Sequence, residues 1–158
     1  PSALFTNAVL NQQAEVNNQG NLRVNLGETL ALIGSNVTNS GSLVAPAGDI
    51  LVLGNNINLI VQSIIDVSSN IGGGNIFIGG DFQGQETLPT ATTTYIGSNV
   101  NLKADANDTG NGGNIIIWSN QNTDFRGNIS AKGGQFSGNG GFVMSIALSK
   151  ILTDNLVQ

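Results

Sequence analysis

One short motif decides the fold, and it occurs as GDILVL at residues 48–53, GNIFIG at 74–79, GNIIIW at 113–118 and GFVMSI at 141–146. Each copy is a glycine, one further residue and then an apolar run of the length of a β-strand. The run returns after 26, 39 and 28 residues, and an earlier copy, ETLALI at 28–33, lies 20 residues before the first. This spacing is typical of the coils of a solenoid.

The rest of the chain also consists of short strands, separated by turns rich in Gly, Asn, Ser and Asp. We predict strands at Leu22–Val24, Thr29–Ile33, Ser42–Val44, Asp49–Leu53, Ile57–Val61, Ile64–Val67, Asn75–Ile78, Thr94–Ile96, Asn99–Lys103, Asn114–Trp118, Asp124–Phe125, Asn128–Ala131 and Gly141–Ser145. About three strands per repeat predict an all-β fold, a parallel β-helix of about six coils of roughly 20–28 residues. The interval of 39 residues is about 11 residues longer than the interval of 28 that follows it. We place the extra residues in a loop insertion at 83–93.

Stacking of coils would put equivalent side chains in ladders along a rod. We expect an apolar core ladder of Ile50, Val52, Ile76, Ile78, Ile115, Ile117 and Val143. Asn75 with Asn114, and Asn99 with Asn128, are predicted to form corner ladders, and Gly and Asn suit the left-handed backbone of sharp corners.

An antiparallel sandwich is the rival fold. It would need two-residue Asn-Gly or Asp-Gly turns between apolar runs, and the sequence places none there.

Composition excludes several classes of function. Only 9% of the 158 residues are charged, whereas about 25% is usual in soluble domains, and Gly (22) and Asn (23) are abundant. With no Cys and no His, the chain cannot form a disulfide, a Cys/His zinc site or a His-based catalytic triad. A net charge of −5 argues against nucleic acid as a partner. No apolar run approaches the roughly 18 residues of a membrane helix, so we expect no membrane insertion.

Two blocks of the second half resemble large bacterial exoproteins of the filamentous haemagglutinin type, cyanobacterial members above all. They are GGNIFIGGDFQG at 73–84 and the run GNGGNIIIWS (110–119), TDFRGNISAKGG (123–134) and SGNGGFV (137–143). The resemblance covers most of residues 1–143. It implies a right-handed parallel β-helix, export through an outer-membrane pore by two-partner secretion, and a secreted or cell-surface adhesin. The family has no catalytic motif in this region. From Met144 onward the chain departs from the family's usual continuation, an acidic residue followed by Ser-Gly-Lys.

Few residues are candidates for a site. Asp81 and Asp108 lie in turns rich in oxygen ligands, which calcium prefers, but no calcium-binding nonapeptide repeats, so we assign no metal site. Trp118 and Tyr95 are the large amphipathic aromatics, and either a sugar ring or the 83–93 insertion can cover Trp118. The ligand stays unknown.

A polysaccharide-cleaving enzyme would need a pair of carboxylates. Asp66 and Asp105 each follow an apolar strand and would come near each other, but the chain has only two arginines as partners. We therefore expect no catalytic residues, no enzyme activity and no cofactor.

The sequence thus predicts β-helix coils over 1–143 and an atypical apolar tail at 144–158 that is a last strand, a cap or a junction. The predicted function is a segment of a secreted or surface adhesin, a rigid rod that displays loops to glycans or other cells. The alternatives are the subunit of an extracellular filament that assembles end to end and, with less support, a polysaccharide-active enzyme.

Overall fold

A computed structural model of the chain describes residues 3–6, 14–81 and 88–147. The regular elements in these residues are β1 (Ala3–Thr6), β2 (Glu15–Asn18), β3 (Asn21–Arg23), β4 (Thr29–Ile33), β5 (Asn36–Asn39), β6 (Ser42–Val44), β7 (Asp49–Leu53), β8 (Asn56–Leu59), β9 (Ile64–Asp66), β10 (Asn75–Ile78), β11 (Thr93–Ile96), β12 (Asn101–Lys103), β13 (Asn114–Ser119), β14 (Asn122–Phe125), β15 (Asn128–Ser130) and β16 (Phe142–Ala147).

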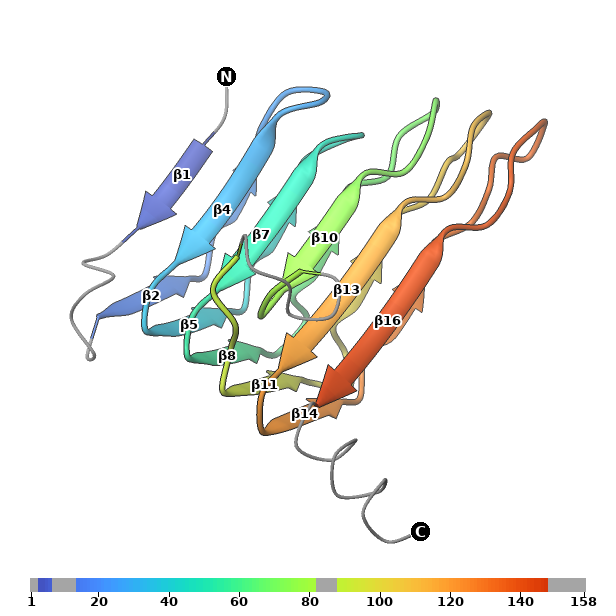
Figure 1. Cartoon of the computed structure of the whole chain (residues 1–158). Coiled ribbons are helices and arrows are strands. Elements are labelled where there is room, and N and C mark those ends of the chain that lie inside the picture. Colours follow the sequence, from blue (N-terminus) through green and yellow to red (C-terminus); the bar gives the residue numbers. More distant parts are fainter. Residues whose placement is uncertain (1–2, 7–13, 82–87, 148–158) are drawn as a thin grey trace, which may run out of the picture.

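The strands form three sheets, and each sheet takes every third strand of the chain (Figure 1). Sheet A has the order β1-β4-β7-β10-β13-β16, sheet B has β2-β5-β8-β11-β14, and sheet C has β3-β6-β9-β12-β15. All of these strand pairs are parallel. The all-β class and parallel stacking are therefore confirmed, and the antiparallel sandwich is excluded. The hand of the winding and the number of coils stay predictions.

The register of sheet A is the one that the repeated motif predicts. Ile50 pairs with Ile76, Ile76 with Ile115, and Ile115 with Val143. Leu30 of the earlier copy pairs with Ile50. The unequal repeat lengths are absorbed in the connections between strands.

The core lies between the three sheets. Leu30, Ile50, Ile76 and Ile115 are fully buried in one ladder of sheet A, and the inward side chains of sheets B and C complete the core, among them Val37, Ile57, Leu43, Ile65 and Leu102. Every residue of the predicted core ladder is buried except Val143, which is 43% exposed in the last strand. Sheet A is also apolar on its outer face, where the outward Ala31 and Ile116 are buried and Leu51 and Phe77 are half-buried.

One predicted corner ladder is confirmed and one is wrong. Asn114 Nδ2 donates to Asn75 Oδ1 at 2.8 Å, and Asn75 Nδ2 donates to Asp49 Oδ1 at 2.9 Å. Asn128, however, pairs with Asn101 rather than with Asn99. The reason is the connection between β11 and β12, a turn over 97–100 closed by the hydrogen bond from Val100 N to Gly97 O. A shift of two residues keeps the same side chains facing inward, so the apolar pattern did not reveal it.

The sequence pattern missed β1, β2 and β5. The strands β2 (EVNN) and β5 (NVTN) each contain one apolar residue, which is too few for a strand period to stand out. The connection between β10 and β11 covers 79–92, and the predicted insertion at 83–93 lies partly outside the described residues. Strand β16 crosses the predicted boundary between 143 and 144, and the rest of that tail, 148–158, is not described.

Glycine is needed before the strands of sheet A because stacked backbones come very close, not because of a left-handed backbone. A Cβ added to Gly113 would lie 1.8 Å from Gly74 O, one added to Gly74 would lie 2.0 Å from Gly48 O, and one added to Gly141 would lie 1.9 Å from Gly113 O. None of these four glycines has a positive φ. The left-handed explanation does hold for Gly27 and Gly79, whose φ angles are 78° and 75°.

We predict that Gly113→Ala destabilises the protein strongly, because the new methyl group would force neighbouring coils apart. The loss should reach the range of about 1–3 kcal/mol that overpacking costs, seen as a lower midpoint in denaturant unfolding. Gly97→Ala is the matched control, since its added Cβ would meet no atom closer than 3.5 Å. It should be neutral or stabilise by about 0.4–1 kcal/mol. Equal effects of the two changes would contradict the close stacking.

Candidate binding surface

The outer face of sheet B carries two columns of polar side chains. Side chains alternate between the two faces of a strand, so each sheet B strand places its first and third residues outward. The first residues form the amide column: Glu15, Asn36, Asn56, Thr93 and Asn122. The third residues form the open column: Asn17, Thr38, Asn58, Tyr95 and Asp124. Neighbouring members of a column are about 4.8 Å apart.

Hydrogen bonds along the rod order the amide column. Asn56 Nδ2 donates to Asn36 Oδ1 at 2.9 Å, and Thr93 Oγ1 donates to Asn56 Oδ1, also at 2.9 Å. Because Asn36, Asn56 and Thr93 are each held by a neighbouring coil, these three side chains have little rotamer freedom left to lose when a ligand binds. The amide column is therefore a preordered polar strip.

The open column offers unused hydrogen-bonding groups. Within the described part of the chain, the side chains of Asn17, Thr38 and Asn58 make no hydrogen bond, so their amide and hydroxyl groups face solvent. They line an open groove of about 280 Å³ with Glu15, Val16 and Asn36. Apart from the carboxylate of Glu15, the groove presents neutral donors and acceptors at regular intervals, which suits an extended polar ligand better than a compact anionic one.

A charged cluster closes this surface at β14. Arg126 Nε donates to Asp124 Oδ1 at 3.0 Å, and its Nη2 donates to Asp124 Oδ2 at 2.9 Å. The guanidinium carbon lies 5.9 Å from the centre of the Tyr95 ring, within the range of a cation–π contact. The hydrogen bonds from Arg126 hold the pKa of Asp124 below its ordinary value and raise the pKa of Arg126. Both side chains stay accessible, 62% for Arg126 and 36% for Asp124.

The two candidate aromatic residues differ in their surroundings. Trp118 is 4% exposed, its Nε1 donates to Asn120 Oδ1 at 3.1 Å, and Asn120 Nδ2 donates in turn to Thr90 Oγ1. The indole therefore packs beneath the β10–β11 connection, in line with the covering alternative in the sequence analysis. Tyr95 is half-buried on the outer face of sheet B, where a ligand can reach it.

The two calcium candidates are not brought together. Asp81 follows β10, whereas Asp108 lies in the connection that precedes β13, so they are at opposite ends of sheet A. Asp108 Oδ1 accepts a long hydrogen bond from Gln135 Nε2, at 3.4 Å. In the described ranges, no three acidic side chains gather as metal ligands would.

Asp66 and Asp105 lie on neighbouring coils, but each fixes a corner. Asp66 Oδ1 accepts from Ser68 N at 2.8 Å. Asp105 Oδ1 accepts from Ser130 Oγ at 2.6 Å and from Lys132 N at 2.8 Å. These bonds account for the two carboxylates as structural groups.

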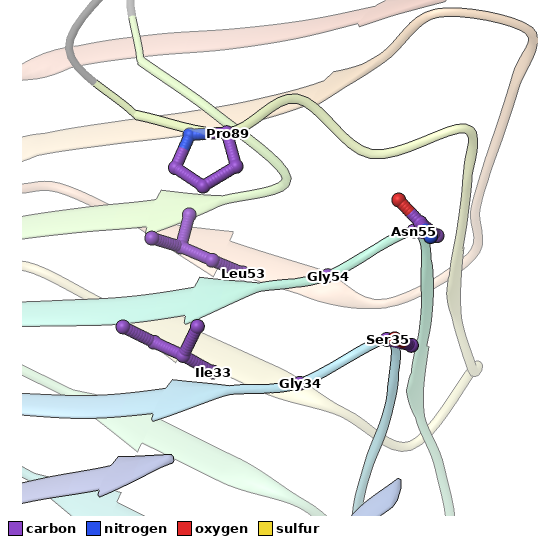
Figure 2. A pocket seen from close by; sticks show the side chains of 7 residues that line it. All are labelled: Ile33, Gly34, Ser35, Leu53, Gly54, Asn55 and Pro89. Atoms are coloured by element: carbon purple, nitrogen blue, oxygen red, sulfur yellow. The ribbon is translucent and has the colours of Figure 1, made fainter. Parts of the chain in front are cut away.

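The other hollows differ in size and openness. Figure 2 shows a hollow beneath Pro89 at the ends of β4 and β7, and at about 60 Å³ it has room for roughly two water molecules rather than a ligand. A groove of about 430 Å³ runs beside sheet C between Arg23, Asp66 and the exposed Ile71.

In the described ranges, no helix has the length and hydropathy needed to cross a membrane.

We predict that Asp124 titrates below the ordinary value of about 3.9, and that Arg126→Gln returns its pKa to that value. Because the folded-state pKa is lowered, the ion pair stabilises the fold above the unfolded-state pKa, and this contribution is lost as the pH falls through the folded-state pKa. NMR titration of the carboxyl carbon checks this. Tyr95→Phe, which keeps the ring, should leave the shift in place, and 1 M salt should reduce it. An unchanged Asp124 pKa in Arg126→Gln would exclude the pair as its cause.

The chain matches no protein-family model and no curated protein. Among solved structures, its fold is similar to the crystal structure of the HMW1 secretion domain from Haemophilus influenzae, with a TM-score of 0.65 and 20% sequence identity. The match covers 85% of this chain and 44% of that one, so the chain spans less than half the length of its structural neighbour. At this identity the likeness concerns the fold alone.

Proposed function

We propose that the chain is a segment of a secreted bacterial exoprotein, exported by two-partner secretion, which acts as a stiff scaffold for attachment to a surface. The observation that carries the proposal is the stack of parallel coils, whose fold is similar to that of a bacterial secretion domain. The sequence blocks at 73–84 and 110–143 add the resemblance to filamentous haemagglutinin-type exoproteins.

A rod of this kind resists bending because every coil is hydrogen-bonded to the next. Asn75 N donates to Gly48 O, Asn114 N to Gly74 O, and Phe142 N to Gly113 O. Equivalent bonds run along sheets B and C, so bending must strain three ladders at once. The scaffold can thus hold a binding surface away from its point of anchorage.

Attachment would use the polar face of sheet B together with the β10–β11 connection. Between Glu15 at one end and Asp124 at the other, the amide and open columns supply neutral donors and acceptors, and Tyr95 supplies an aromatic surface. The connection at 79–92 replaces the two residues, Gly54 and Asn55, that join β7 to β8 in the preceding coil. We propose a neutral glycan as the ligand class and a mechanical rather than a catalytic role, since the candidate carboxylates hold corners.

Export is tested by placing the chain behind a Sec signal peptide, with and without a two-partner-secretion pore in the outer membrane. We expect folded protein in the medium only when the pore is present. The isolated periplasmic fraction and a non-cognate outer-membrane porin serve as controls. Release that does not depend on the pore, or retention despite a cognate pore, would contradict two-partner secretion.

Attachment is tested separately by removing residues 81–88 and joining Gly80 to Pro89. A Cβ added to Gly80 would lie 3.5 Å from Thr90 Cγ2, so the two sides of the connection are close enough to join. We expect the thermal midpoint to change by only a few degrees and binding to a neutral glycan array to fall at least tenfold. A second variant, Asn58→Ala, should weaken binding through the open column with the connection intact. Undiminished binding in both variants would reject this surface.

A further inference from the structure

The outer face of sheet C carries exposed apolar side chains on its central strand and beside it. Ile64, the first residue of β9, is 39% exposed, and Ile71, in the connection after β9, is 66% exposed. Strand β9 lies between β6 and β12, so its coil has a described neighbour on either side. These two side chains therefore face solvent even with the neighbouring coils in place.

Hydrogen bonds fix the connection that carries Ile71. Ile71 N donates to Ser69 Oγ at 3.2 Å, and Ser69 Oγ donates to Gly72 O at 2.6 Å. The next coil holds the same connection through the bond from Asn107 N to Ser69 O at 2.8 Å. The fold thus keeps a large apolar side chain in water on a fixed backbone. Several such side chains on one face are typical of an interaction surface.

Opposite charges lie in one column of this face. The third residues of β3, β6 and β9 are neighbours and point outward: Arg23, Val44 and Asp66. At about 4.8 Å per strand, the backbones of Arg23 and Asp66 are about 10 Å apart, with Val44 between them. Within the described ranges, the Arg23 side chain makes no hydrogen bond or ion pair, and the Asp66 carboxylate accepts only from Ser68 N, at 2.8 Å. Both charges are therefore available to a partner.

A groove runs beside this column. The connection between β9 and β10 covers 67–74, whereas those over 24–28 and 45–48 are shorter. The longer connection forms one wall of the groove of about 430 Å³ and presents Ile71 there, and Leu26, which is 60% exposed, lies on the opposite side. The groove therefore has an apolar side chain on each side and opposite charges along its length.

We propose that this face of sheet C pairs two copies of the chain side by side, with the rods antiparallel and a two-fold axis that runs along β6. The axis exchanges β3 with β9, so Arg23 lies opposite the partner's Asp66, and Asp66 lies opposite the partner's Arg23. Val44 meets the partner's Val44 on the axis. Leu26 meets the partner's Ile71, so the wall of each groove covers the apolar side of the other.

The order of the charges decides the direction of the pairing. In parallel rods, with the axis along the column, Arg23 would lie opposite the partner's Arg23 and Asp66 opposite the partner's Asp66. Like charges that meet at an interface are costly, so the antiparallel pair is favoured. It leaves the outer face of sheet B uncovered, and two copies would present that polar face twice to a ligand.

Sedimentation equilibrium over a series of concentrations tests the pairing through charge changes. We expect the unchanged chain to show a reversible equilibrium between monomer and dimer. Arg23→Asp and Asp66→Lys should each raise the dissociation constant at least tenfold, because the axis repeats every like-charge contact. The double variant Arg23→Asp/Asp66→Lys should return to within about threefold of the unchanged chain. A general effect of net charge would instead move the two single variants in opposite directions, since one change adds negative charge and the other removes it.

Two further variants guard against a change in fold, since Asp66 also holds Ser68 N. Lys132→Asp is the matched control for Arg23→Asp, because it makes the same change of charge just after β15, three coils from β6, and should leave the dissociation constant unchanged. Ile71→Ser should raise the dissociation constant about tenfold through lost apolar contact. Circular dichroism and the thermal midpoint show which variants keep the fold.

Three results would overturn the proposal. The first is an unchanged chain that stays monomeric at every concentration. The second is a folded double variant that does not recover the dimer. The third is an equal dissociation constant for Arg23→Asp and Lys132→Asp, which decides the matter even if Asp66→Lys does not fold.

Discussion

The structure depends on the parallel hydrogen bonding of each coil to the next at a single repeated separation. The amide of Asn75 donates to Gly48, that of Asn114 to Gly74, and that of Phe142 to Gly113. Since these bonds allow no variation in spacing, side chains at equivalent positions must stack directly on one another. Any residue that does not fit its neighbour above and below would disturb two coils at once. The core ladders, the amide column and the glycines before sheet A all follow from this constraint.

Apart from β1, sheet A could be predicted closely from the sequence because its strands are apolar on both faces. The bounds of β4, β7 and β10 are those expected from the motif, and the pairing of Ile50, Ile76 and Ile115 follows from aligning its copies. Sheet B was harder to predict. Its strands β2 and β5 depend on one valine each, and their asparagines read as turn residues until the partner strands are known.

The candidate surface was predictable only in part for the same reason. Tyr95 was singled out as an aromatic, but its neighbours Asp124 and Arg126 belong to another coil, 29 and 31 residues further on. The amide column needs the register of sheet B, which the sequence did not provide. Trp118 was also singled out, but its indole is bonded to Asn120, which is held in turn by Thr90 of the β10–β11 connection. The length of that connection could be predicted from the sequence, whereas its path could not. The length of the corner before β12 likewise decides where Asn99 lies. Its pairing was predicted wrongly because a shift of two residues in the turn over 97–100 leaves the same side chains facing inward.

A solenoid of this kind separates stability from recognition. The core needs only the inward ladders, so the connections can grow, as between β10 and β11, without changing the coil. The outer faces of sheets B and C are free to be mostly polar, and charged side chains such as Glu15, Asp66 and Asp124 can lie there without disturbing the core. Stiffness comes from the ladders, and any specificity comes from the faces and connections that they hold in place.

The most direct test of this account is the measurement of scalar couplings across hydrogen bonds by NMR on the isotope-labelled protein. The account predicts couplings from the amide nitrogen of Asn75 to the carbonyl carbon of Gly48, from Asn114 to Gly74, and from Phe142 to Gly113. These residues are 27, 40 and 29 positions apart in the sequence, so the pattern is specific to parallel coils in this register. Couplings between consecutive strands in an antiparallel pattern, or between residues shifted by one or two positions, would contradict it.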